Sequence, residues 1–111
     1  MGDLIYFNYA SAGNEIYNNV FYIKSGLSPN IIHENNTKNH TYNFFNNIIY
    51  NLSSATSGAD YAFASGSFTQ NSNISNNVFY GNHHATEPSD SFKLTSNPNF
   101  LNPGSGSIGI I

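Results

Sequence analysis

An asparagine pair that occurs three times in similar surroundings is the feature that most restricts how this chain can fold. The three units are NEIYNNVFYIKSG from Asn14, YNFFNNIIYNLSS from Tyr42 and SNISNNVFYGNHH from Ser72. The second Asn of the pair recurs after 28 residues and then after 30. A period near 30 with short apolar segments indicates structural repeats that stack on one another.

Each unit predicts a strand, a sharp corner and a second strand. Apolar residues precede the pair at Ile16, Phe44 and Ile74, and VFY or IIY follows it. Asn is depleted from strands but tolerates the left-handed backbone conformation that a corner requires. We predict that one Asn turns the chain while its neighbour hydrogen bonds to its counterparts in adjacent repeats. This structural ladder would comprise Asn18, Asn19, Asn46, Asn47, Asn76 and Asn77.

A further strand is predicted ahead of each unit. Leu4, Ile32 and Ala62 each lie fifteen residues before the second Asn, in the segments DLIYF, NIIHE and DYAFA. We expect these three residues to align in neighbouring repeats. No segment has a sustained 3.6-residue apolar period, so the sequence predicts an all-β domain.

The repeats resemble those of the right-handed parallel β-helix proteins, the pectate-lyase-like superfamily, in which NxIxNNxFY units recur. The tail SNPNFLNPGSGSIGI, residues 96–110, is similar to the DPxFxNPxxG segment that closes such domains in secreted bacterial carbohydrate-active proteins, with Asn97 replacing the usual Asp. The resemblance implies one right-handed parallel β-helix domain over residues 1–111, with about three to four coils stacked about 4.8 Å apart. Repeat units would lie near 14–26, 42–54 and 72–84, with a closing segment over 90–111.

The start of the chain, GDLIYFNYA, already has the pattern of an internal strand. Solenoids normally cover their ends with atypical repeats, because an open end exposes apolar side chains and unpaired strand edges. We therefore expect the chain to be the C-terminal part of a longer β-helix, or its open end to be covered by another copy. The expected partners are upstream coils or self-association.

The resemblance also suggests a function. It implies the C-terminal portion of a carbohydrate-active protein of the polysaccharide lyase or glycoside hydrolase class, extracellular or periplasmic, with catalytic residues mainly outside this chain. The alternative is a non-enzymatic glycan-binding or surface structural module. Only 8% of residues are charged and none is Arg, which argues against a nucleic-acid partner. No apolar run reaches the length of about 20 residues that a membrane span needs.

Two clusters are candidate sites. His83, His84, Glu87 and Asp90 offer metal ligands, although their spacing matches no recurring zinc pattern and a solvated turn is the simpler interpretation. The second cluster, a candidate substrate-binding site, comprises His33, Glu34, Asp60 and Tyr61. Glu34 and Asp60 would border a polar groove if they point outward from neighbouring coils, and His33 would then act as an acid or base near neutral pH. The simpler interpretation is that these residues lie on the solvent face of a strand. The residues themselves indicate no cofactor, whereas Ca²⁺ is implied by the family resemblance.

An aromatic column allows two interpretations. Tyr22, Tyr50 and Tyr80 occupy the same position in the three units. They would form a platform for sugar rings or simply stack on one another along the repeats.

Overall fold

The computed structural model describes residues 2–7, 13–34, 42–53, 60–63, 73–101 and 103. These ranges contain nine strands and no helix, so the all-β prediction is confirmed for them. Accordingly, this part of the chain has no helix long and apolar enough to cross a membrane.

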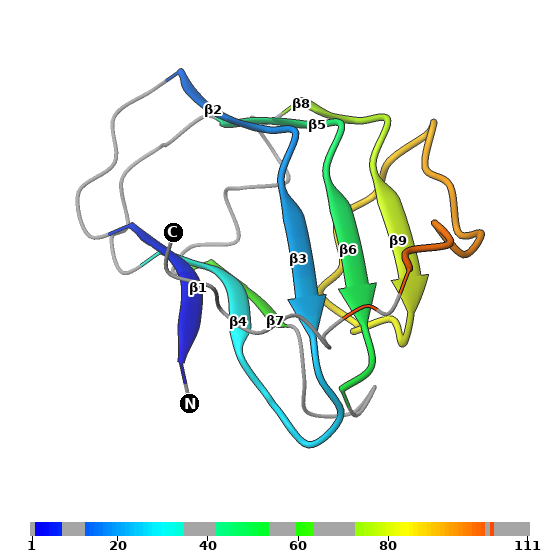
Figure 1. Cartoon of the computed structure of the whole chain (residues 1–111). Coiled ribbons are helices and arrows are strands. Elements are labelled where there is room, and N and C mark those ends of the chain that lie inside the picture. The colour runs from blue at the N-terminus through cyan, green and yellow to red at the C-terminus, as the bar shows by residue number, and fades with distance from the viewer. Residues whose placement is uncertain are drawn as a thin grey trace, which may run out of the picture.

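The nine strands form three parallel sheets within the described ranges (Figure 1). β1 (Asp3–Phe7), β4 (Asn30–Glu34) and β7 (Asp60–Phe63) make the first sheet. The second contains β2 (Asn14–Tyr17), β5 (Tyr42–Phe45) and β8 (Asn73–Ser75). The third contains β3 (Val20–Ile23), β6 (Ile48–Asn51) and β9 (Val78–Gly81).

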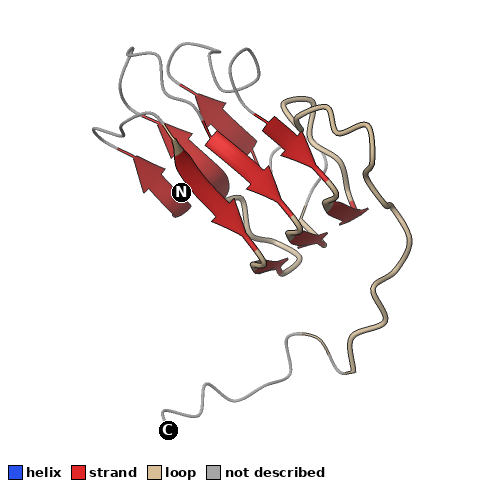
Figure 2. Ribbon diagram, turned by 90° about the horizontal axis from the view of Figure 1, so that it is seen from above, coloured by secondary structure: helices blue, strands red, loops and turns tan. Residues whose placement is uncertain are grey.

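Each repeat contributes one strand to every sheet, and equivalent strands lie side by side (Figure 2). Around the Asn pairs the register follows the sequence repeat: Ile16 pairs with Phe44 and Phe44 with Ile74. Beyond the corner, Tyr22 pairs with Tyr50 and Tyr50 with Tyr80. The same side-chain types therefore meet in successive repeats, as the sequence predicts.

The predicted alignment of the first sheet is wrong by one residue. Ile32 pairs with Ile5 and with Tyr61, not with Leu4 and Ala62. The register of β4 against β7 shifts between Asn30 and Ile32, which is the signature of a β-bulge or similar irregularity. Counting back from the Asn pair assumes a connection of constant length and shape. The irregularity breaks that assumption between β4 and β7. Between β1 and β4 the lengths differ, because Ile5 precedes Ile16 by 11 residues whereas Ile32 precedes Phe44 by 12.

The corners have the predicted backbone. Asn18, Asn46 and Asn76 have φ values of 58°, 54° and 59°, in the left-handed region. Each separates the second-sheet strand of its repeat from the third-sheet strand. An Asn at this point allows the chain to turn sharply where other side chains would be strained.

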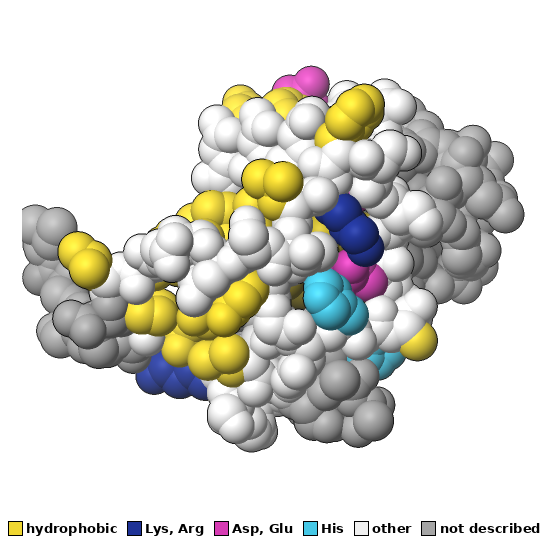
Figure 3. Space-filling view, turned by 90° about the vertical axis from the view of Figure 1, so that its right-hand side faces the viewer, with side chains coloured by type: hydrophobic (Ala, Val, Ile, Leu, Met, Phe, Trp, Pro, Cys, Tyr) yellow, Lys and Arg dark blue, Asp and Glu magenta, His cyan; other side chains and the backbone are white. Residues whose placement is uncertain are grey.

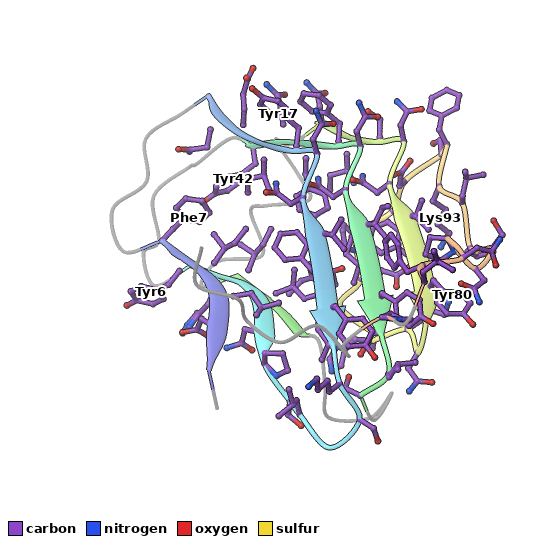
Figure 4. The ribbon with its side chains drawn as sticks, in the orientation of Figure 1. Tyr6, Phe7, Tyr17, Tyr42, Tyr80 and Lys93 are labelled. Atoms are coloured by element: carbon purple, nitrogen blue, oxygen red, sulfur yellow. The ribbon has the colours of Figure 1, made fainter. Side chains whose placement is uncertain are left out.

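The inward faces of the three sheets meet in one apolar core. Phe44, Phe79, Ile23, Ile31 and Ile32 are at most 1% exposed. Tyr42 also points into the interior, whereas Tyr17 lies on the outer side of its sheet (Figure 4). The chain has no cysteine and therefore no disulfide bond. Burial of aromatic and aliphatic side chains is thus the main stabilising contribution in this core.

Beyond β9 the chain starts a further turn and then covers part of the third sheet. Leu94 forms a parallel bridge with Val78, and its N–H donates to the Asn77 carbonyl oxygen at 2.9 Å. The following segment brings Phe100 to Tyr50, with 5.9 Å between ring centroids. The start of the closing segment therefore packs against the repeats.

Candidate functional site

The second Asn of each pair forms a continuous hydrogen-bonded ladder. Asn19 Nδ2 and the Asn19 backbone N–H both donate to Asn47 Oδ1 at 3.1 Å. Asn47 repeats this arrangement toward Asn77 Oδ1, at 3.1 Å from Nδ2 and 2.9 Å from the backbone nitrogen. Asn47 Nδ2 also donates to the Ile16 carbonyl oxygen of the preceding repeat at 2.9 Å. Asn47 and Asn77 are fully buried, and this ladder satisfies their polar atoms.

Asp90 receives the last hydrogen bonds of the ladder. Its Oδ2 accepts from the Asn77 backbone N–H and from Asn77 Nδ2, both at 2.9 Å. Its Oδ1 accepts from the backbone N–H groups of Asn76 at 3.2 Å and Phe92 at 2.8 Å. In the bonds from one Asn to the next the donors all face this end, and a carboxylate, which only accepts, terminates the series.

This position changes the interpretation of Asp90 as a metal ligand. The side chain is 6% exposed and both of its oxygens are engaged with the ladder. Burial alone would raise the pKa of Asp90, but hydrogen bonds from Asn77, Phe92 and Asn76 outweigh burial and place that pKa below its usual value. Asp90 is therefore a charged structural cap.

Of the other three candidate ligands, His83 and Glu87 contact each other, whereas His84 contacts Thr86. His83 Nδ1 lies 2.7 Å from Glu87 Oε2, and Lys93 Nζ lies 3.4 Å from Glu87 Oε1. His84 Nδ1 instead lies 2.9 Å from the Thr86 hydroxyl. Basic, acidic and His side chains accordingly appear together on the face shown in Figure 3.

The described residues of the His83–Asp90 loop do not fit a metal centre. In the described ranges no group of three or more His, Asp and Glu side chains is placed to hold an ion. Ca²⁺ requires about six to eight oxygen ligands, commonly from several carboxylates. The four residues of the His83–Asp90 loop are not brought together in that way.

The candidate groove residues are also separated. Asp60 pairs with Asn30, whereas Glu34 pairs with Phe63, so the two acidic positions lie at opposite ends of adjacent strands. His33 contacts Asp3 instead, with 3.2 Å between Nδ1 and Oδ1. The side chains of Glu34 and Asp60 lie outside the described part of the structure.

A small polar cluster surrounds Asp3 at the edge of the first sheet. Asn30 Nδ2 donates to Asp3 Oδ1 at 2.6 Å, and Tyr6 packs edge-on against His33 with centroids 5.2 Å apart. The hydrogen bond from Asn30 lowers the pKa of Asp3, burial opposes this, and His33 lowers it further. The contacts with Asp3 and Tyr6 explain the position of the His33 side chain, and no bound ligand is needed to explain it.

Tyr61 does not face a ligand groove. Its side chain is 3% exposed and lies against Phe79, with ring centroids 6.4 Å apart. Burial, with the nearby Glu87 charge, raises the pKa of Tyr61 well above its ordinary value. Its hydroxyl has no hydrogen-bond partner in the described part of the chain. Tyr61 is therefore a core residue, paired in register with the buried Ile32.

The tyrosine column packs on itself. Tyr50 lies 5.2 Å from Tyr22 and 4.7 Å from Tyr80 between ring centroids, at interplanar angles of 44° and 59°. Phe100 adds a further contact to Tyr50, which is 8% exposed. This geometry favours stacking along the repeats over a flat open platform.

The outer face of the second sheet, β2–β5–β8, carries an aromatic pair that the sequence interpretation missed. Tyr17 and Phe45 stack with centroids 5.0 Å apart and an interplanar angle of only 6°. Tyr17 is 47% exposed. The available signal was an aromatic residue immediately before the Asn pair in two of the three repeats, at a position where the third has Ser75.

Exposed amides lie on both sides of this pair. Asn43, two residues before Phe45, accepts a 3.0 Å hydrogen bond at Oδ1 from Asn73 Nδ2. On the other side are the exposed corner residues Asn18, Asn46 and Asn76. We call this surface, formed by Tyr17, Phe45, Ser75, Asn43 and Asn73, the outer aromatic face.

Comparison with protein-family models, with curated proteins and with solved structures found no match.

Proposed function

We propose that the chain is a right-handed parallel β-helix module of an extracellular or periplasmic carbohydrate-active protein, and that this module binds glycan. The β-helix proposal is supported by three parallel sheets that each take one strand from every repeat. It is further supported by left-handed Asn corners and a ladder running across the repeats. These features suit coils that stack in register.

The observation that carries glycan binding is the nearly parallel stack of the exposed Tyr17 ring on the half-buried Phe45 ring. Flat aromatic faces pack against the C–H surface of a pyranose ring, and exposed amides beside them can hydrogen bond to sugar hydroxyls. Ligand sites commonly combine an apolar surface with a few polar groups that fix orientation. The outer aromatic face has both.

A binding role suits this module better than bond cleavage. Of the described carboxylates, Asp90 caps the ladder, Asp3 contacts Asn30 and His33, and Glu87 contacts His83 and Lys93. This leaves Glu15 on the second sheet as a single exposed carboxylate, not an acid and base pair. A lyase or hydrolase needs acid and base groups positioned around the substrate. In the proposed whole protein, a polysaccharide lyase or glycoside hydrolase, those groups belong to other coils.

The exposed edge of the first repeat is where such coils would pack. β1, β2 and β3 are edge strands of their sheets, and Asn19 Oδ1 accepts no hydrogen bond from the described residues, unlike Asn47 Oδ1 and Asn77 Oδ1. Leu4, Tyr6 and Leu27 are about half exposed near this edge. We propose that a preceding coil, from a longer chain or from a second copy, donates to Asn19 and pairs with these edges.

The test is direct binding of oligosaccharides to the purified chain, measured by a glycan array and then by isothermal titration calorimetry. We expect a Kd in the millimolar range or tighter, weakened at least tenfold by the double variant Tyr17→Ala with Phe45→Ala. Tyr22→Phe is the matched control, because it keeps the ring of a stacked tyrosine on another sheet and should bind as the wild type does.

Two outcomes would contradict the proposal. Failure of every glycan to bind the folded chain would remove the binding role. Release of unsaturated or reducing sugar ends by the purified chain alone would place catalysis in this module and not in other coils.

A further inference from the structure

The aromatic column of the outer aromatic face stops one repeat early. Tyr17 pairs with Phe45, and Phe45 pairs with Ser75, so the three side chains occupy equivalent positions on β2, β5 and β8. Tyr17 covers one face of the Phe45 ring. A hydroxymethyl group stands where a third ring would continue the stack, and no described ring packs on the opposite face of Phe45.

Because Ser75 has no ring, a gap remains beside the Phe45 face on the side away from Tyr17. We call this gap the step, and its depth is close to the separation of two stacked rings. Neighbouring strands in a sheet lie about 4.7–4.9 Å apart, and the Tyr17 and Phe45 centroids are 5.0 Å apart. A flat ring placed above Ser75 would therefore meet Phe45 at the separation that Tyr17 already has on the other side. A pyranose ring is a puckered chair, but the C–H groups on one of its faces can pack on an aromatic ring in the same way.

Polar atoms that can bind hydroxyl groups border the step. The bond from Asn73 Nδ2 to Asn43 Oδ1 leaves Asn43 Nδ2 and Asn73 Oδ1 without a protein partner in the described ranges. The Ser75 hydroxyl likewise has no described partner, although its backbone carbonyl oxygen accepts from Asn77 Nδ2 at 3.1 Å. One donor, one acceptor and one hydroxyl thus surround an apolar ring face.

The charge of this surface indicates which sugars fit. Its three strands contain one side chain that is charged at neutral pH, Glu15, which is exposed and pairs in register with Asn43. No Lys lies on β2, β5 or β8, and the chain has no Arg. A carboxylated sugar would find no cation to neutralise it here and would approach the negative Glu15.

We propose that a neutral pyranose ring of a glycan stacks on the Phe45 face above Ser75, held by Asn43 and Asn73. This inference rests on the proposed glycan binding and deepens it by naming the subsite and the substrate class. The site selects uncharged hexose or pentose units over uronates. It is independent of the tyrosine column, which lies on the third sheet.

The experiment fills the step with a protein ring. Ser75→Tyr should complete the Tyr17–Phe45 stack and weaken the binding of neutral hexaoses, such as cellohexaose or mannohexaose, at least tenfold. Tyr22→Phe, on the third sheet, is the control and should bind as the wild type does. Ser75→Ala leaves the step empty and removes one hydroxyl, so it should weaken binding by about threefold at most, the effect of one weak hydrogen bond. Phe45→Leu, which keeps apolar volume but removes the flat face, should also weaken binding at least tenfold.

Folding of each variant is checked by thermal unfolding, and NMR reports the location of the ligand. We expect neutral oligosaccharide to shift the side-chain amide signals of Asn43 and Asn73, and polygalacturonate to bind at least tenfold more weakly. Full binding by both Ser75→Tyr and Phe45→Leu, with loss of binding in Tyr17→Ala, would overturn the subsite while leaving glycan binding intact. Preference for polygalacturonate would overturn the substrate class, and no binding of any glycan would overturn both proposals.

Discussion

Asn77 donates two hydrogen bonds to one oxygen of Asp90, from its backbone nitrogen and from its side-chain Nδ2, both at 2.9 Å. The same two groups of Asn47 donate to Asn77, and those of Asn19 donate to Asn47. The ladder therefore has a direction, with donors facing one way and a carboxylate at the receiving end. Its interior and its two ends should differ in their contribution to stability.

Asn47 lies in the interior of the ladder and should be the most sensitive position. We expect Asn47→Ala to lower the free energy of unfolding by about 1–3 kcal/mol. It leaves the buried Ile16 carbonyl oxygen and the part-buried donors of Asn19 without their partner, and it removes one of the two donors to Asn77 Oδ1. Urea denaturation measures this difference. Asn19→Ala, at the exposed end, is the comparison and should cost less than about 1 kcal/mol. Equal losses in the two variants would contradict a cooperative buried ladder.

Asp90 should make stability depend on pH in the acid range. Its pKa in the folded protein lies below the unfolded value of about 3.9, because the ladder donors stabilise the charged form. The stabilisation is therefore complete above the unfolded value and is lost as the pH falls through the folded value. We expect the unfolding free energy of the wild type to decrease below about pH 4.

Asp90→Asn tests this assignment. An amide has one acceptor oxygen, whereas the Asp90 carboxylate accepts at both oxygens, so the variant should be less stable at pH 7 by about 1–3 kcal/mol. It should also lose part of the acid dependence. Asp3→Asn, at a more exposed carboxylate, is the control for general charge effects. A variant that matches the wild type in both stability and pH slope would show that Asp90 does not cap the ladder.

At Tyr61 we do not expect a substitution to destabilise the fold, in contrast to Asn47 and Asp90. Its buried hydroxyl has no partner among the described residues, and an unpaired buried hydroxyl opposes folding. We expect Tyr61→Phe to leave the free energy of unfolding unchanged or to raise it by up to about 1.5 kcal/mol. Oligosaccharide affinity should not change. Destabilisation by more than about 1 kcal/mol, or loss of glycan binding, would show that the hydroxyl has a role.

The repeat around the Asn pairs could be predicted because its side chains have defined chemistry. A left-handed corner favours Asn, and buried amides in successive repeats satisfy one another, so the corner and the ladder follow from residues such as Asn46 and Asn47. The strand pairing of Phe44 and Ile74 follows from the same alignment.

Asp90 and Tyr61 could not be placed in this way. Asp90 comes 13 residues after Asn77, although the ladder positions are spaced by 28 and 30, so the repeat gives no reason to align it with the Asn residues. Tyr61 follows a register shift in β4 that changes which residue pairs with Ile32. Both depend on irregular segments, where hydrophobic alternation carries little information.

Gly81 should be among the least tolerant positions of the third sheet. Its φ of 96° is unfavourable for a residue with a side chain, and it pairs with Asn51 between β6 and β9. A Cβ built there would overlap the Asn51 carbonyl oxygen and lie 2.9 Å from the carbonyl carbon. These are backbone atoms within a hydrogen-bonded pair of strands, so they cannot move aside as the end of a flexible side chain would.

We expect Gly81→Ala to lower the free energy of unfolding by more than about 3 kcal/mol, combining backbone strain of about 1–2 kcal/mol with steric overlap. Gly13→Ala is a matched control, because Gly13 has a φ of 83° and no atom within 4 Å of an added Cβ. It should show the strain alone, at about 1–2 kcal/mol. Urea denaturation of both variants separates the two effects. Since the strain is common to both positions, equal losses would mean that β6 and β9 do not approach as closely at Asn51 as their pairing requires.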